Sequence, residues 1–124
     1  MGLADNALFP DNAVIIPELV KDIPYKYFIF SAIDALIHAV ESYVSPKSNS
    51  LTESIGLHAI ELILKGFIEI NKNGQNYYSE IIEDFCLGSN YAGIVFGNTG
   101  VGAVHALSYP LGGEFHISHG LSNA

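Results

Sequence analysis

The chain has 124 residues, of which 49% are hydrophobic and 15% are charged, a composition typical of one small globular domain. Its 13 acidic and 5 basic residues give a formal net charge of -8. This charge repels nucleic acid phosphates and anionic membrane surfaces, so nucleic acid and membrane-surface binding are excluded as functions.

The single cysteine, Cys86, cannot form an internal disulfide, and the N-terminus lacks the charged, apolar and small-residue pattern of a signal peptide. We therefore expect a cytoplasmic protein in which Cys86 is a small buried residue. Charges at Glu61, Lys65 and Glu69 interrupt the longest apolar stretches, so no run reaches the roughly 20 apolar residues that cross a bilayer.

Residues 1–24 are predicted to form an irregular lead-in, because Pro17 and Pro24 interrupt regular structure. The β-branched run at residues 14–16 allows at most one short strand there. We treat the whole chain as a single partial domain, in which residues 25–124 form a helical region.

Two long helices are predicted next. The first begins near Tyr25 and runs to about Val44, with Ser31-x-x-Asp34 as a capping box. The second has a similar capping signature at Ser50-x-x-Glu53 and apolar residues at helical spacing, and it runs to Asn73-Gly74.

A third helix is expected from near Tyr78, until the stretch GNTGVG at residues 97–102 interrupts the pattern. Residues 101–108 favour a short helix that Tyr109-Pro110 ends, and Gly112-Gly113 then predicts a turn. The predicted fold is therefore mainly α, with too little strand for an independent α/β domain.

Candidate metal ligands occur on the first predicted helix. Asp34 and His38 are four residues apart, so their side chains leave the same face one turn apart. Glu41 continues this face, where it either hydrogen-bonds a ligand or is solvated, and the solvated interpretation is favoured. Taken alone, Asp34 is better explained as a capping acid and His38 as a core histidine.

Two further histidines, His105 and His119, flank a segment that contains Pro110 and a Gly-Gly pair, so the chain can return His119 towards His105. One carboxylate and three imidazoles suit Fe(II) or Zn(II), and Mn(II) less well. Ordinary loop histidines are the alternative. The spacing alone leaves the two interpretations evenly matched.

The remaining candidates are weaker. His58 lies on the second helix without a ligand-type partner nearby, which favours a surface or packing role. His116 precedes His119 by three residues and is a minor candidate for lining the pocket. The stretch at residues 97–102 lacks the Gly-Lys-Ser/Thr ending of a phosphate loop and follows no strand, so we interpret its glycines as a backbone bend or a close helix contact.

Two motifs carry a family resemblance: Asp34-x-x-x-His38-x-x-Glu41, and GVGAVHALSYPLGGEFHISHGLSNA at residues 100–124. On these motifs the chain resembles the iron-containing alcohol dehydrogenase family, and within it the 4-hydroxybutyrate dehydrogenases. The resemblance implies the helical metal-binding region of a dehydroquinate synthase-like fold. It also implies four ligands for one divalent metal: Asp34, His38, His105 and His119.

The activity that the resemblance implies is a metal-dependent exchange of hydride between an alcohol or aldehyde and NAD(H) or NADP(H). For the 4-hydroxybutyrate group, it interconverts 4-hydroxybutyrate and succinate semialdehyde. Many members of the wider family carry a further histidine where this chain has Tyr109. Tyr109 is therefore either a substrate or cofactor contact, or a buried tyrosine with a satisfied hydroxyl.

The chain also departs from the family, because residues 1–124 contain no counterpart of its nucleotide-binding N-terminal domain. We therefore expect the isolated chain to be inactive, since most of the cofactor site is missing. The alternative is a metal-binding or structural remnant without turnover. Helices that lack their usual neighbours expose apolar surface, so we also predict a homo-oligomer.

Overall fold

The computed structural model describes residues 6–8 and 10–124. Within this part every regular element is helical and no strand is present, which confirms the prediction of a mainly α chain. None of the described helices has both the length and the low polarity that a membrane span requires. The elements are η1 (Asn6–Leu8), η2 (Pro17–Leu19), α1 (Tyr25–Tyr43), α2 (Ser50–Asn73), η3 (Gln75–Glu80), α3 (Ile82–Thr99), α4 (Ala103–Phe115) and α5 (His119–Asn123).

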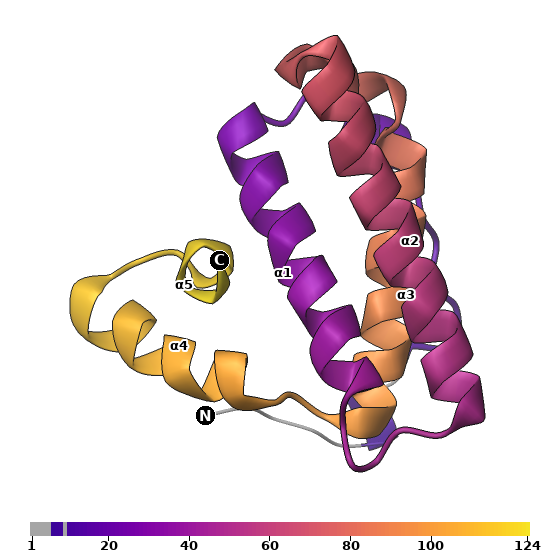
Figure 1. Cartoon of the computed structure of the whole chain (residues 1–124), viewed down its shortest axis with the longest axis vertical. Helices are drawn as coiled ribbons and strands as arrows, with labels where there is room; N and C mark the ends of the chain where they lie inside the picture. The colour runs from indigo at the N-terminus through magenta and orange to yellow at the C-terminus, as the bar shows by residue number, and fades with distance from the viewer. Residues whose placement is uncertain (1–5, 9) are drawn as a thin grey trace.

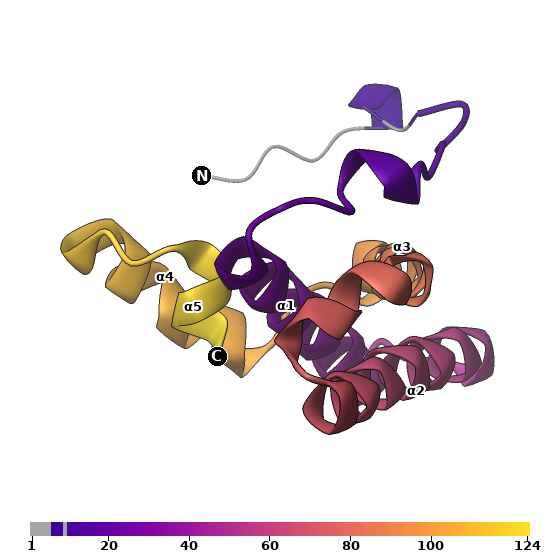
Figure 2. The ribbon, with the colours of Figure 1, turned by 90° about the horizontal axis from the view of Figure 1, so that it is seen from above.

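Helices α1, α2 and α3 pack against one another, and each runs opposite to the one before it (Figure 1). Short connections between long helices favour this antiparallel arrangement. Helices α4 and α5 lie on the side of α1 that faces away from α2 and α3 (Figure 2). α1 is therefore covered on two sides, and it is the element that joins the three-helix body to the C-terminal pair.

The side of α1 that faces α2 and α3 is apolar. Its buried members, at the spacing of one helix face, are Phe28, Ala32, Ala35 and Ala39. The ring of Phe28 stacks on Tyr78 at a centroid distance of 4.7 Å and meets Phe85 edge-on, also at 4.7 Å. Both arrangements are favourable for aromatic pairs. The three alanines leave room for the neighbouring helices to approach closely.

The predicted helices are present, but both predicted capping boxes are wrong. α1 begins after Pro24, so Ser31 and Asp34 lie inside the helix, where the backbone N–H groups are already bonded. At α2 the cap is Asn49, whose Oδ1 accepts hydrogen bonds from the N–H groups of Leu51 and Thr52. The Thr52 hydroxyl in turn accepts from the N–H of Asn49, which completes the box one residue earlier than predicted.

The C-terminal third also differs from the prediction. α3 continues to Thr99 and ends where Gly100 takes a φ of 76°, so the bend is confined to residues 100–102. α4 then runs through both Pro110 and the Gly-Gly pair at 112–113 without a turn. Pro110 removes one backbone hydrogen bond but α4 continues past it. The reversal comes instead at His116, whose φ of 54° is left-handed.

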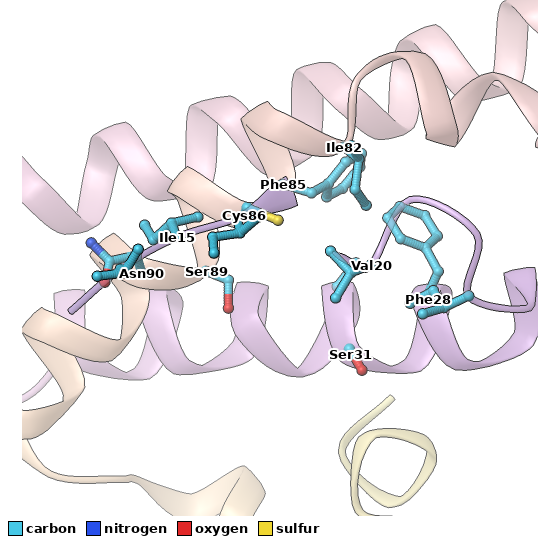
Figure 3. Close-up of a pocket in the computed structure, with 13 residues that line it drawn as sticks. Ile15, Val20, Phe28, Ser31, Ile82, Phe85, Cys86, Ser89 and Asn90 are labelled. Atoms are coloured by element: carbon cyan, nitrogen blue, oxygen red, sulfur yellow. The ribbon is translucent and has the colours of Figure 1, made fainter. Parts of the chain in front are cut away.

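Residues 10–24 of the lead-in lie along one side of α1 and α3 (Figure 2). Residues 14–16 form no strand, because a strand needs a partner and none is present among the described residues. Ile15 and Val20 from this segment instead help to close a pocket of about 440 Å³ against α1 and α3, as Figure 3 shows. Cys86 also lines this pocket and is only partly buried, so it is less enclosed than predicted.

Helices α2 and α3 approach each other closely at Gly66. A Cβ atom built there would lie 2.5 Å from the Cζ of Phe85, which is held in the aromatic core. We predict that Gly66→Ala lowers the free energy of unfolding by about 1–3 kcal/mol, as overpacking does.

The matched control for this prediction is Gly93→Ala on α3, where a Cβ atom would meet no heavy atom within 4 Å. This substitution should be neutral or raise stability by up to about 1 kcal/mol, because alanine favours the helix. Urea unfolding followed by circular dichroism measures both. Equal effects of the two substitutions would contradict the packing described here.

Candidate metal centre

The second side of α1 carries polar side chains towards α4 and α5. Asp34 and His38 lie one turn apart, with Asp34 Oδ2 3.8 Å from His38 Nδ1. Both are partly buried, and the His38 ring packs on Phe96 and stacks on His105 at a centroid distance of 4.4 Å. The sequence placed Asp34 and His38 on one helix face, and the structure agrees.

His105 and His119 reach the same place from the first turns of α4 and α5. His105 Nε2 lies 3.7 Å and His119 Nε2 3.6 Å from Asp34 Oδ1. The turn at His116 reverses the chain between α4 and α5, so that His119 faces His105 at a ring-centroid distance of 5.3 Å. The predicted return of His119 towards His105 is therefore observed, by a turn at a different position.

The four side chains Asp34, His38, His105 and His119 each offer one ligand atom, and these atoms all lie within 4.8 Å of one another. Two ligands held about 2.1 Å from one ion at the tetrahedral angle are about 3.4 Å apart. The separations between the Asp34 oxygens and the three histidine nitrogens, 3.6, 3.7 and 3.8 Å, are close to this value, and the other pairs of ligand atoms lie within 4.8 Å. The residues therefore fit a single divalent ion, and nitrogen with carboxylate oxygen suits Fe(II) or Zn(II).

The cluster is closed on one side and open on the other. The His105 side chain is 1% exposed, whereas that of His119 is 48% exposed.

Burial lowers the pKa of His38 below its ordinary value, although the neighbouring Asp34 opposes this effect. His38 therefore favours the neutral imidazole, which is the form that binds a metal.

Glu41 corrects the sequence analysis, which favoured a solvated carboxylate. Its side chain is buried and its Oε2 lies 2.7 Å from His105 Nδ1. Oε2 also accepts a hydrogen bond of 2.8 Å from the N–H of Gly102, and Oε1 accepts one of 2.6 Å from the N–H of Val104. Burial alone raises the pKa of Glu41, but these three donors outweigh it and hold the pKa below its ordinary value.

Gly102 explains how the carboxylate comes so close. A Cβ atom at this position would lie 2.8 Å from Glu41 Oε1, so a larger residue would displace the carboxylate from its place. Gly102 also caps α4 without any side-chain hydrogen bond, which leaves backbone N–H groups free for Glu41. The interpretation as a bend or a close contact is confirmed at Gly100 and Gly102, whereas Gly97 lies inside α3 with no heavy atom within 4 Å of a built Cβ.

Asn123, the last residue of α5, was missed by the sequence analysis. Its Nδ2 contacts Asp34 Oδ1 and lies 3.1 Å from His105 Nε2 and 3.3 Å from His119 Nε2. Its Oδ1 is buried without a hydrogen-bond partner in the described part of the chain. The four-residue spacing from His119 was the available signal, because it places both side chains on one face of a helix.

The other candidates are placed as follows. Tyr109 is 57% exposed, and its ring lies nearly parallel to that of His119 at 6.0 Å, so the interpretation as a buried tyrosine is wrong. His116 is exposed at the turn and has no described contact with the four-residue cluster. His58 is exposed beside Glu61 and Tyr91, as the surface interpretation predicted.

Comparisons with known proteins show which family the chain is similar to. Residues 28–124 match the Fe-containing alcohol dehydrogenase family, C-terminal. The chain is 55% identical over 122 residues to the 4-hydroxybutyrate dehydrogenase of Clostridium kluyveri, covering 98% of the chain and 33% of that protein. It is 43% identical over 117 residues to long-chain-alcohol dehydrogenase 1 of Geobacillus thermodenitrificans, covering 94% and 29%.

The fold of the chain is similar to part of a solved structure. The sulfoacetaldehyde reductase from Bifidobacterium kashiwanohense, in complex with NAD+, aligns with a TM-score of 0.87 at 28% identity. This alignment covers 98% of the chain and 32% of the reductase. The chain therefore belongs to the iron-containing alcohol dehydrogenase family. It spans about a third of the length of the relatives it matches.

Glu41 makes the stability of this region dependent on pH. A carboxylate whose pKa is lowered by folding stabilises the protein fully above its ordinary pKa of 4.5, and the stabilisation is lost as the pH falls through the folded value. We predict that Glu41→Gln lowers the free energy of unfolding by about 1.5–3 kcal/mol at neutral pH.

The difference between wild type and Glu41→Gln should shrink as the pH falls below 4.5. Urea unfolding of metal-free protein at several pH values measures it. A difference that stays constant from neutral pH to well below this value would show that the charge of Glu41 contributes nothing.

Proposed function

We propose that this chain is the metal-binding part of an alcohol dehydrogenase, and that the cluster holds one divalent metal ion, Fe(II) first and Zn(II) as the alternative. We further propose that the whole enzyme interconverts 4-hydroxybutyrate and succinate semialdehyde with NAD(H) or NADP(H). The 55% identity to a 4-hydroxybutyrate dehydrogenase supports this substrate. The observation that carries the metal proposal is the convergence of four ligand atoms within 4.8 Å.

The ligands define the charge of the site. Asp34 contributes one negative charge, and the three imidazoles contribute none when they bind as neutral rings. A divalent ion in this set therefore keeps one net positive charge. When bound, the metal supplies a Lewis acid for the alcohol or carbonyl oxygen, and the nicotinamide exchanges the hydride.

The four side chains are unequally buried, so the cluster has a closed inner side and an open outer side. His105 closes the inner side, which keeps water away from that side of the site. His119 and Tyr109 stand at the open side, where their rings stack. We propose that a substrate enters from this side, where the exposed Tyr109 would hydrogen-bond a polar group on it.

The test of the metal proposal compares wild type with His105→Ala and with His119→Ala. Wild type should take up about one equivalent of Zn(II), or of Fe(II) without oxygen, and gain about 2.7 kcal/mol of stability at a hundredfold excess over Kd. Both variants should lose most of this gain. His119 is half exposed, so its substitution separates ligand loss from misfolding.

His58→Ala is the control, because His58 is exposed on α2 and contacts only Glu61 and Tyr91 among the described interactions. Metal analysis and thermal unfolding give the two readouts. Equal metal uptake by wild type and both ligand variants would contradict the proposal, as would a loss caused by His58→Ala.

We also propose that the chain self-associates through α4. Four apolar residues repeat on this helix at three- and four-residue spacing and remain 36–75% exposed: Val104, Leu107, Leu111 and Phe115. Such a row is typical of a surface that another protein surface covers. Light scattering should show a dimer or larger assembly, and Leu107→Glu should shift it towards the monomer. A monomeric wild type would contradict this proposal.

A further inference from the structure

We propose that Glu41 is a positioning residue for His105: its carboxylate fixes the imidazole tautomer and holds the start of α4 against α1. This inference rests on the proposed metal site and names a residue outside its ligand set. Glu41 lies one turn beyond His38 on α1, so the helix that supplies two of the proposed ligands also supplies the group that orients a third.

The hydrogen bonds fix the tautomer. Glu41 faces three N–H donors, from the backbone of Gly102, the backbone of Val104 and the ring of His105. A carboxylate in this position can only accept, so Nδ1 of His105 must carry the proton. Nε2 of the neutral ring is then unprotonated, and it is the atom that lies 3.7 Å from Asp34 Oδ1. The lone pair that a metal needs therefore faces the cluster.

The same carboxylate fixes the position of the ring. His105 is the third residue of α4, and two of the three donors to Glu41 are backbone groups within three residues of it. A negative charge at a helix N-terminus is favourable, because unpaired N–H groups point at it. The N-cap of α4 is Gly102, which has no side chain to cap the helix, so Glu41 supplies the cap from another helix.

The test uses metal-free protein first. Nitrogen NMR of histidine-labelled wild type should show His105 almost entirely protonated at Nδ1. In Glu41→Ala the two tautomers should mix, because the acceptor is gone. Glu41→Gln keeps the shape but only one acceptor oxygen, so its effect should be in the same direction and smaller. If Glu41→Ala does not fold, Glu41→Gln still tests the inference.

The second readout is Zn(II) affinity. Loss of a group that orients a metal-binding histidine typically weakens binding by about 10- to 100-fold, which is the change expected for Glu41→Ala. The control is Thr52→Ala, which breaks the capping box of α2, a helix that supplies none of the proposed ligands. It should lower stability while leaving both the zinc affinity and the His105 tautomer unchanged.

Failure of this inference and failure of the proposed function give different results. If wild type binds no zinc, the proposed metal site fails, while the metal-free tautomer measurement still tests Glu41. An unchanged tautomer in both Glu41 variants overturns the inference. So does a zinc affinity within about twofold of wild type in a folded Glu41→Ala, set against the loss expected for an orienting group.

Discussion

The buried carboxylate of Glu41 is the interaction on which the arrangement of the candidate site depends. It receives two backbone N–H groups at the start of α4 and the ring N–H of His105. Each of these donors would be costly to bury without a partner. Since Glu41 belongs to α1, satisfying them fixes where α4 begins relative to α1, and therefore where His105 stands relative to Asp34.

α1 makes this possible because it has two different faces. The apolar face, rich in alanine, packs closely on α2 and α3 and fixes the position of α1 in the three-helix body. The other face presents Asp34, His38 and Glu41 to the C-terminal helices. A rigid helix that is packed on one side can hold the side chains on its other side within narrow limits, as a metal site requires.

The convergence of His105 and His119 on Asp34 and His38 is expected from the family resemblance, because spacing alone leaves it open. The sequence itself predicts the helices and the Asp34–His38 pair, because helical periodicity and four-residue spacing are local signals. It did not predict the turn at His116 or the continuation of α4 through Pro110, which depend on tertiary packing. The sequence does not reveal the burial of Glu41, because its backbone partners lie more than 60 residues away along the chain. Long-range pairing of this kind leaves no trace in local spacing.

The most direct test of the central claim is X-ray absorption at the zinc edge on protein loaded with one equivalent of Zn(II). If Asp34, His38, His105 and His119 bind the ion, the spectrum should show three imidazole nitrogens and one carboxylate oxygen at about 2.0–2.2 Å, without sulfur. His105→Ala should remove one imidazole from this first shell. A spectrum with fewer than three imidazoles in wild type, or one unchanged by His105→Ala, would show that these four residues do not form the site.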